Sequence, residues 1–315
     1  MAWMEPMSNK EKQTDKKMVL VILGPTASGK TALGVRLAAE LNGEIVSADS
    51  RQVYKGMDIG TGKDLQEYVV NGKQIQYHLI DVAGPNEEFN LAKYQKLASD
   101  AIADILERGH LPIIVGGSGL YLQAIVDNYA LGSAKPDLVK RTELENLGKE
   151  ELFSCLEKLK PDFAAKLNNS DRNNARRLAR YIEIFEQKGK PAEKIESPYE
   201  FLLIGLEISD EEMRARIRAR IIKRLENEDM VGEVERLNNE GVDWQRLISF
   251  GLEYKFISYY LLEKLEYDDM IEKLTDASYR FAKRQKTWFK RWQKQGRKIH
   301  WLTSIEEARE LMAKK

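Results

Sequence analysis

The chain has 315 residues, enough for roughly two domains, and its apolar fraction of 43% is ordinary for a globular protein with a core. The 50 basic and 50 acidic residues give a formal net charge of zero, so a nucleic-acid partner would have to meet a local basic face. A single cysteine, Cys155, excludes an internal disulfide and a cysteine-based zinc site.

The N-terminus, residues 1–17, is polar and rich in Lys, Glu, Asn and Met, and we expect a disordered extension there. It contains no apolar segment of the kind that a signal peptide requires. The sequence contains no run of 18 apolar residues, so we expect no membrane span. We therefore expect a cytoplasmic protein without a membrane partner.

The first apolar run, 19–23, leads into a stretch that fits the phosphate-binding pattern G-x-x-x-x-G-K-[ST]: Gly24, Pro25, Thr26, Ala27, Ser28, Gly29, Lys30 and Thr31. A helical period follows over 32–41. Strand, glycine-rich turn and helix together aim backbone N–H groups at an anion. Lys30 would add a point charge, and the Thr31 hydroxyl would bind Mg²⁺. The pattern predicts a phosphate or diphosphate site but does not identify ATP.

A second strand is predicted at 44–48, and it runs directly into a polar, glycine-rich segment from Asp49 to Thr61. Ligands of open α/β sheets bind at the carboxyl ends of the strands. Asp49 is therefore a candidate for chemistry beside the phosphate loop. The alternative is that Asp49 caps a helix, because Asp and Ser are favoured at that position.

Two more strands are predicted at 77–82 and 111–115, with a helix between them from about 91 to 108. The second of these strands leads into a turn of small residues around Ser118, which a ligand could approach closely. Strands that alternate with helices over 18–128 predict a parallel, doubly wound α/β sheet.

The pattern changes over 131–199 to charged, amphipathic helices with few strand signals. This predicts a mainly helical insertion between two parts of the core, 18–130 and 200–315. One predicted helix carries three arginines whose spacing places two of them on one face: Arg176, Arg177 and Arg180. A solvated face is the default interpretation of such a run, and contact with phosphates is the alternative.

The rest of the chain predicts a strand, a basic helix, a second helix and a last strand, at 201–208, 214–225, 271–292 and 299–302. The helix at 271–292 interleaves aromatic residues with cations, among them Lys283 and Arg284. This pattern suits phosphate backbones and stacked bases. Aromatic residues in the core and cations at the surface explain part of it.

A phosphate loop followed by an aspartate at the next strand end is typical of small-molecule kinases. In such an enzyme Asp49 would activate a hydroxyl and ATP would lie along the loop. Gln52 and Tyr54 point instead to a planar, hydrogen-bonding substrate such as a base. The residues alone leave both interpretations open.

Five segments together resemble the tRNA dimethylallyltransferase family: Gly24–Thr31, Asp49–Thr61, Tyr77–Asp81, Val115–Tyr121 and Ala282–Trp292. The resemblance runs in the family's order from about residue 18 to 303, and Asp49–Thr61 is its most specific part. It implies transfer of a dimethylallyl group from dimethylallyl diphosphate to N6 of adenine 37, next to a tRNA anticodon. It also implies a P-loop NTPase-like α/β core that binds diphosphate in place of ATP, with a helical insertion that grips the anticodon stem-loop.

The resemblance assigns roles to individual residues. Asp49 would accept the proton of the adenine amino group. Lys30, Thr31 with Mg²⁺, and an arginine would stabilise the departing diphosphate. The family's R-I-x-x-R pattern matches Arg216–Arg220 and makes Arg220 the candidate for that arginine.

The tRNA-binding residues that we expect come from the segment after the second strand, the small-residue turn and the basic helices: Asp49, Ser50, Arg51, Gln52, Ser118, Arg176, Arg177, Arg180, Lys283 and Arg284. Ser118, also a candidate catalytic residue, stands where the family usually has Thr and keeps the hydroxyl. Tyr77 stands where the family commonly has His, so the resemblance does not extend to any role of that His.

Three alternatives remain beside a monomeric tRNA dimethylallyltransferase. An isopentenyltransferase acting on free adenine nucleotides would have no need of the basic insertion. An ATP-dependent small-molecule kinase would use the loop for ATP. A catalytically idle RNA-binding protein is disfavoured because Lys30, Thr31 and Asp49 are all retained.

Overall fold

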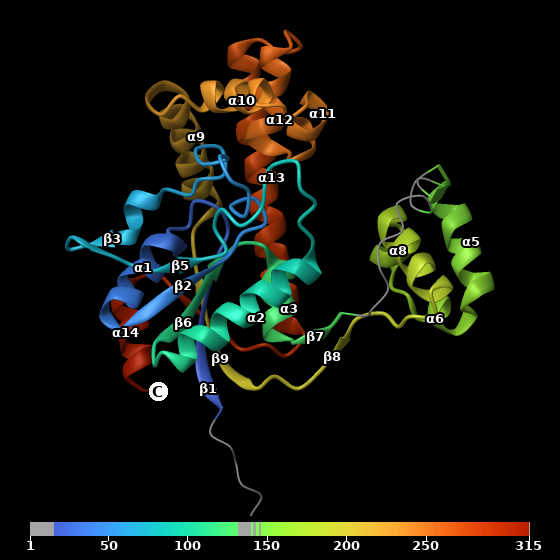
Figure 1. Ribbon diagram of the computed structural model, residues 1–315, viewed down its shortest axis with the longest axis horizontal. Helices are drawn as coiled ribbons and strands as arrows, with labels where there is room; N and C mark the ends of the chain where they lie inside the picture. The colour runs from blue at the N-terminus through green and yellow to red at the C-terminus, as the bar shows by residue number, and fades with distance from the viewer. Residues whose placement is uncertain (1–15, 132–139, 141–142, 145, 315) are drawn as a thin grey trace, which may run out of the picture. The chain divides into compact units, whose positions relative to one another are not determined.

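Six strands form one sheet in the order β10-β9-β1-β6-β2-β5 (Figure 1). Their bounds are Lys17–Leu23 for β1, Gly43–Ala48 for β2, Tyr77–His78 for β5, Leu111–Gly116 for β6, Tyr199–Leu206 for β9 and Ile299–Leu302 for β10. Each neighbouring pair is parallel. The computed structural model describes residues 16–131, 140, 143–144 and 146–314, and it confirms the predicted parallel α/β core.

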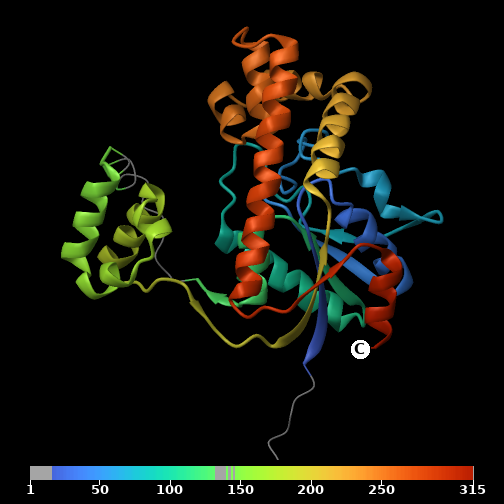
Figure 2. The same ribbon diagram turned by 180° about the vertical axis from the view of Figure 1, so that it is seen from behind.

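Helices cover both faces of this sheet. Residues 19–23 of β1 are fully buried, as expected for a strand in a sheet that is covered on both sides. Helices α2, α3 and α13 pack on one face, and α1 and α14 on the other; their bounds are Leu91–Glu107, Gly119–Val126, Tyr267–Lys294, Lys30–Glu40 and Ile305–Ala313. Seen from behind, α13 is one long helix that runs down over the sheet (Figure 2).

Three strands end level with one another at the carboxyl edge of the sheet. Gly116, the last residue of β6, pairs with Leu23 of β1 and with Ala48 of β2. A side chain cannot replace the hydrogen of Gly116, because a Cβ there would lie 2.2 Å from the carbonyl oxygen of Ala48. The residues that follow β1 and β2, Gly24 and Asp49, therefore start at the same edge, one strand apart.

The opposite edge of the sheet holds a charge cluster around Glu44, at the start of β2. The buried Glu44 carboxylate accepts two hydrogen bonds from Arg108, one of them at 2.9 Å, and contacts ring nitrogens of His78 at 2.8 Å and His110 at 2.5 Å. Arg108 also donates to Asp104 at 2.7 Å. The hydrogen bonds from Arg108, His78 and His110 lower the pKa of Glu44 to about 2. Two of the three histidines, scattered in sequence, thus share one structural cluster.

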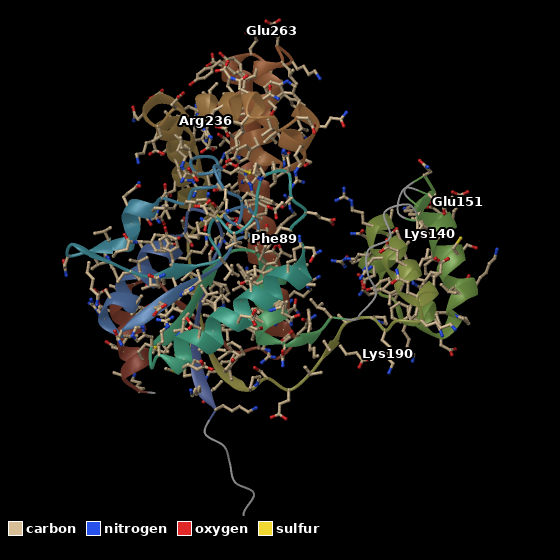
Figure 3. The ribbon with its side chains drawn as sticks, in the orientation of Figure 1. Phe89, Lys140, Glu151, Lys190, Arg236 and Glu263 are labelled. Atoms are coloured by element: carbon tan, nitrogen blue, oxygen red, sulfur yellow. The ribbon has the colours of Figure 1, made fainter. Side chains whose placement is uncertain are left out.

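Four helices between β9 and β10 build a second core with the first half of α13: α9 (Asp210–Asn227), α10 (Met230–Asn239), α11 (Trp244–Ser249) and α12 (Leu252–Leu261). Val53, Tyr54 and Met57, from the segment after β2, are part of this core. Arg236, labelled in Figure 3, donates to the carbonyl of Gly56 at 2.9 Å. The segment that begins at Asp49 is therefore held between the sheet and these helices.

Residues 127–196 form a second compact unit, which begins and ends a few residues before the predicted 131–199. Its described helices are α5 (Lys149–Leu159), α6 (Pro161–Lys166), α7 (Asn169–Arg172) and α8 (Ala175–Glu186). They enclose their own apolar core, which includes Leu152, Leu156 and Leu178. An antiparallel pair, β7 (Tyr129–Ala130) with β8 (Glu193–Lys194), joins the two ends of the unit. Lys140, Glu151 and Lys190 mark this unit in Figure 3.

The predicted strand at 77–82 is wrong beyond its first two residues. Leu79 and Asp81 have φ of 64° and 57°, values that an extended strand does not allow. The region before β5 adds only short elements, a 3-10 turn at Leu65–Tyr68 and a hairpin of β3 (Val69–Val70) and β4 (Lys73–Gln74).

The predicted extension over 1–17 lies outside the described residues except for Lys16 and Lys17, and Lys17 already begins β1. None of the described helices has the length and the apolar composition that crossing a bilayer requires. The two units, 127–196 and the remainder of the described chain, each contain their own hydrophobic core.

Candidate active site

The phosphate loop follows β1 and turns directly into α1. The N–H of Ser28 donates to the carbonyl of Pro25 at 3.3 Å. Gly29 precedes the helix with φ 86°, a left-handed conformation that glycine adopts without strain. Lys30 begins α1, and its ammonium donates to the same Pro25 carbonyl at 3.2 Å. The first N–H groups of a helix have no helical acceptor, so the turn offers them to an anion.

A cavity of about 290 Å³ lies beside the loop. It brings together four of the five predicted catalytic residues: Lys30, Thr31, Asp49 and Arg220. Thr26, Ala27 and Gly29 line it as well, whereas Gly24, Pro25 and Ser28 of the predicted diphosphate loop are not part of its wall. Phosphate-binding groups and a carboxylate from the next strand end therefore face one space.

Arg220 contacts the phosphate loop more closely than Arg216 does. Its Nη2 donates to the hydroxyl of Thr26 at 2.7 Å. Arg216 pairs with Glu212 at 2.6 Å and reaches the carbonyl of Ala27 only at 3.4 Å. Both arginines line the cavity, and Arg220 makes the closer contact.

The cations of the cavity are held under electrostatic strain. Burial lowers the pKa of Lys30 to about 8; Asp49 opposes this shift and Arg220 adds to it. Burial and the neighbouring Arg224 lower the pKa of Arg220 to about 10. Desolvation and like charges both disfavour the charged forms. A polyanion bound between Lys30 and Arg220 would relieve that cost.

Asp49 does not cap a helix. Its Oδ1 accepts the N–H of Arg51 at 2.9 Å, and the residues that follow form turns. The carboxylate lines the cavity at the end of β2. The local structure thus presents Asp49 to a ligand of the cavity and removes the alternative in which it only starts a helix.

Gln52 and Ser118 both hold the Asp49 segment in place. The Gln52 amide accepts from the Ser47 hydroxyl at 3.0 Å and donates to the carbonyl of Gly62 at 2.9 Å. The Ser118 hydroxyl accepts the N–H of Ser50 at 3.0 Å. These contacts tie the segment after β2 to the loop after Thr61 and to the turn after β6.

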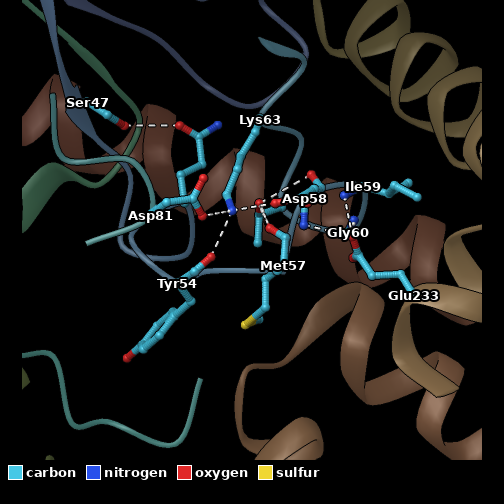
Figure 4. Close-up of polar contacts among 12 residues, drawn as sticks. Ser47, Tyr54, Met57, Asp58, Ile59, Gly60, Lys63, Asp81 and Glu233 are labelled. Atoms are coloured by element: carbon cyan, nitrogen blue, oxygen red, sulfur yellow. Dashed lines mark hydrogen bonds and ion pairs between the residues drawn. The ribbon is translucent and has the colours of Figure 1, made fainter. Parts of the chain in front are cut away.

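Two charged residues that the sequence pattern did not single out fix the segment 57–63 (Figure 4). Buried Glu233 of α10 accepts three consecutive backbone N–H groups, at 2.7, 2.7 and 2.9 Å, from Asp58, Ile59 and Gly60. The buried ammonium of Lys63 donates to the carbonyl of Tyr54 at 2.8 Å and to the carboxylates of Asp58 and Asp81. An acidic residue on the apolar face of the Met230–Asn239 helix was the signal that could have identified Glu233.

Gln285 of α13 is another residue that sequence reasoning missed. Its Oε1 accepts the N–H of Thr26 at 2.9 Å, and its Nε2 donates to the carbonyl of Gly117 at 2.9 Å. It therefore links the phosphate loop to the turn after β6. The turn needs small residues because α13 packs against it: a Cβ on Gly117 would lie 2.3 Å from the Gln285 amide.

Five of the six predicted tRNA-binding cations lie on two helices, and the sixth, Arg51, lies in the turn after β2. Helix α8, in the unit 127–196, carries Arg176, Arg177 and Arg180. Arg177 pairs with Asp171, and Arg180 pairs with Glu183 at 2.9 Å. Helix α13 carries Lys283, which pairs with Asp210 at 3.0 Å, and Arg284, whose guanidinium lies 5.8 Å from the ring of Phe281. Phosphate contact by the paired cations would have to compete with these carboxylates.

Comparison with known proteins gives consistent matches. A family model described as IPP transferase matches residues 52–292. The tRNA dimethylallyltransferase 1 of Syntrophus aciditrophicus is 45% identical over 91% of this chain and 93% of its own length. The tRNA dimethylallyltransferase 2 of Citrifermentans bemidjiense is 46% identical over 94% of this chain and 95% of its own length.

Two solved structures are similar over most of the chain. The tRNA isopentenylpyrophosphate transferase of Bacillus halodurans is 35% identical, with a TM-score of 0.67 over 95% of this chain and 96% of that one. A eukaryotic dimethylallyltransferase described as acting on tRNA is 28% identical, with a TM-score of 0.69 over 86% of this chain and 69% of that one. Sequence and fold thus point to the same group of proteins.

Proposed function

This chain belongs to the IPP transferase family, and from that premise we propose that it is a tRNA dimethylallyltransferase. It transfers the dimethylallyl group of dimethylallyl diphosphate to N6 of adenine 37, next to a tRNA anticodon, and releases diphosphate. The proposal includes action as a monomer in the cytoplasm. Relatives named tRNA dimethylallyltransferase match more than nine-tenths of the chain and support it.

One observation carries the proposal: the Asp49 carboxylate lines the same cavity as Lys30, Thr31 and Arg220. The exocyclic N6 of adenine is a weak nucleophile, because its lone pair is delocalised into the ring. As the N6–C bond forms and the allylic C–O bond breaks, N6 must lose a proton. Asp49 accepts that proton as a general base.

The leaving group departs with the electron pair of the C–O bond. Lys30, Arg220 and the first N–H groups of α1 stabilise the negative charge that develops on its bridging oxygen. The lowered pKa values of Lys30 and Arg220 support this role, since both cations gain from an anion placed between them.

Mg²⁺ fits the donors that this site offers. Thr31 and Asp49 contribute oxygen atoms to the same cavity, and oxygen is the ligand that Mg²⁺ prefers. Among the described residues no group of three or more His, Cys, Asp or Glu could hold a metal. Thr31 would therefore hold the ion together with the diphosphate and water. When bound, the ion neutralises charge on the diphosphate.

The basic faces of α8 and α13 are the proposed tRNA contacts. The unit 127–196, with Arg176, Arg177 and Arg180, grips the anticodon stem-loop. The target adenine leaves its stack to reach Asp49, as bases do in other base-modifying enzymes. Gln52 lines the cavity, and hydrogen bonds of Ser50, Arg51 and Ser118 position the segment around Asp49.

Competition between acceptors tests the proposal. The protein is incubated with Mg²⁺, labelled dimethylallyl diphosphate and equal concentrations of unmodified tRNA, AMP and ATP. We expect label in tRNA only. Label in AMP or ATP would favour an enzyme for free adenine nucleotides, and phosphate transfer from ATP to a small molecule would favour a kinase.

A further inference from the structure

A second, smaller cavity of about 40 Å³ lies beside the first. Thr26, Lys30, Asp49, Thr61 and Arg220 line both cavities. The remaining wall of the smaller one comes from the turn after β2 and from α9, α12 and α13, and it includes Arg51, Glu253 and Ser278. Asp49 thus stands between the space beside the phosphate loop and a space enclosed by helices.

Four hydrogen-bond donors from the wall of the smaller cavity are buried and have no acceptor: Arg51 Nε, Arg51 Nη2, Arg220 Nε and Ser278 Oγ. The Ser278 side chain is almost fully buried, at 2% exposure. Buried polar groups of native proteins are nearly always hydrogen-bonded, so a cluster of unmatched donors needs an explanation. An acceptor-rich ligand supplies one.

The two free donors of Arg51 are not independent. Its Nη1 donates to Glu253 at 2.6 Å, and its guanidinium lies 5.5 Å from the centre of the Tyr254 ring. Nε and Nη2, which remain, are the two donors of one edge of the guanidinium plane. Such an edge binds two oxygens of a phosphate or carboxylate at once.

The backbone just before Glu253 is in a strained conformation. Gly251 and Leu252 both have positive φ, 72° and 43°, and a left-handed conformation is strained for leucine. Burial acts to raise the pKa of Glu253, but Arg51 and Arg220 hold it below its usual value. The carboxylate therefore stays ionised and fixes Arg51 in one orientation.

Charge and size narrow the ligand to a phosphate group. Four cations line the smaller cavity against two carboxylates: Lys30, Arg51, Arg220 and Arg224 against Asp49 and Glu253. The volume of about 40 Å³ admits roughly three water-sized groups, which is enough for the two non-bridging oxygens of a phosphodiester and too small for a purine base. Ala27, Gly29 and Thr31 line only the larger cavity, so the loop contacts of the diphosphate belong there.

We propose that the smaller cavity binds a backbone phosphate of the tRNA, next to the nucleotide presented to Asp49, with Arg51 as its bidentate donor and Glu253 as the positioning residue of Arg51. The proposal rests on the proposed function. Ser278 and Arg220 supply further donors. The site anchors the RNA strand within reach of the reacting base.

The test compares the double variant Arg51→Met/Glu253→Gln with wild type and with Arg246→Lys. The double variant removes both charges of the ion pair, so no unpaired charge is left buried. Arg246 is a matched control, since it donates to the carbonyls of Pro85 and Glu87 at 2.8 Å and stacks on Phe250 outside both cavities. Affinity for unmodified tRNA is titrated against salt, and affinity for dimethylallyl diphosphate with Mg²⁺ is measured separately.

We expect the double variant to bind tRNA about 10- to 100-fold more weakly, as for a charge-assisted contact, with the salt slope reduced by about 0.7–0.9. Its affinity for dimethylallyl diphosphate and the behaviour of Arg246→Lys should stay near wild type. Glu253→Gln alone should weaken tRNA binding less than the double variant. An unchanged slope and tRNA affinity would overturn the proposal, and so would a loss confined to dimethylallyl diphosphate, which would assign the phosphate to the diphosphate. Wild type that binds no tRNA would contradict the proposed function itself.

Discussion

Strand β2 has one carboxylate at its start, Glu44, and another just after its end, Asp49. The charged groups around Glu44 are paired with one another, whereas the cations near Asp49 are not fully paired. At the amino edge Glu44 is surrounded by Arg108 and two histidines, and its pKa is lowered to about 2. At the carboxyl edge Lys30 and Arg220 line the same cavity as Asp49, and their pKa values are lowered to about 8 and about 10.

The difference separates groups that stabilise the fold from groups that bind a ligand. The Glu44 cluster matches each charge with a partner, so its electrostatic energy supports the folded state. Lys30 and Arg220 are buried without enough hydrogen-bond acceptors or carboxylates to offset their desolvation. Their charges therefore destabilise the ligand-free protein, and a bound anion would stabilise them. A charged group is a better functional candidate where the protein alone does not satisfy it.

The largest effect is expected from Asp49→Asn. Loss of a general base lowers turnover by roughly 10²–10⁴-fold, while affinity for dimethylallyl diphosphate should hardly change. Single-turnover transfer to tRNA measures the first quantity, and a binding titration measures the second. Glu44→Gln is the matched control on the same strand, and its transfer rate should equal that of wild type where both are folded. Near-normal turnover of Asp49→Asn would remove Asp49 from the chemical step.

Lys30→Met tests whether the unsatisfied cation serves the diphosphate. Hydrogen bonds to charged groups are strong enough that its loss should weaken dimethylallyl diphosphate binding by roughly 10- to 150-fold. Arg36→Met is the control, since Arg36 is an exposed cation of the same helix that lies outside the 290 Å³ cavity. Equal affinities of the two variants, measured by titration with Mg²⁺, would contradict the assignment.

The lowered pKa of Glu44 predicts that the free energy of unfolding decreases in acid. Its folded pKa of about 2 lies below the ordinary value of 4.5, so the contribution is complete above pH 4.5 and disappears as the pH falls to about 2. The shift corresponds to about 1–3 kcal/mol, because solvent at the partly exposed Arg108 screens the interaction. Urea unfolding from pH 7 to pH 2 should show this loss in wild type but not in Glu44→Gln. Glu40→Gln, which breaks the exposed pair with Arg309, should cost less than about 1 kcal/mol.

The smallest effect is expected in the unit 127–196. Replacing Arg177 and Arg180 by Ala should lower the salt dependence of tRNA affinity by about 0.7–0.9 for each phosphate that the variant no longer neutralises. Because both arginines already pair with carboxylates, the decrease in affinity should be modest. Arg309→Ala, which removes one paired surface arginine elsewhere, should leave the slope unchanged. If the double variant behaves like Arg309→Ala, these arginines form only a solvated helix face.

The sequence was sufficient where a local pattern decides the structure. The apolar runs of β1, β2, β6, β9 and β10 and the G-x-x-x-x-G-K-[ST] stretch predicted the sheet and the phosphate loop, because burial and turn geometry act over a few residues. The sequence pattern failed at 79–82. Leu79 and Asp81 take a left-handed conformation there, although the composition of the run 77–82 favours a strand.

The site could be predicted only in part, for a related reason. Lys30, Thr31 and Asp49 follow strand ends, so topology alone brings them together. Glu233, Glu253 and Gln285 come from helices far along the chain and meet the site through tertiary packing. An acidic residue on an apolar helix face marks Glu233, but no local pattern distinguishes Glu253 and Gln285 from ordinary helix residues. Only the fold shows which groups these residues contact.

Thermal unfolding of ligand-free Lys30→Met and Glu44→Gln at pH 7 tests the comparison most directly. Removing the Lys30 charge should stabilise the protein by about 1–3 kcal/mol, since part of the side chain still meets solvent. A lowered lysine pKa makes wild type gain stability as the pH rises from about 8 to 10.5, so the advantage of Lys30→Met should shrink over that range. Glu44→Gln should lower the melting temperature. A melting temperature that falls in both variants would contradict the account, because Lys30 would then stabilise the fold and would not be a charge kept for a ligand.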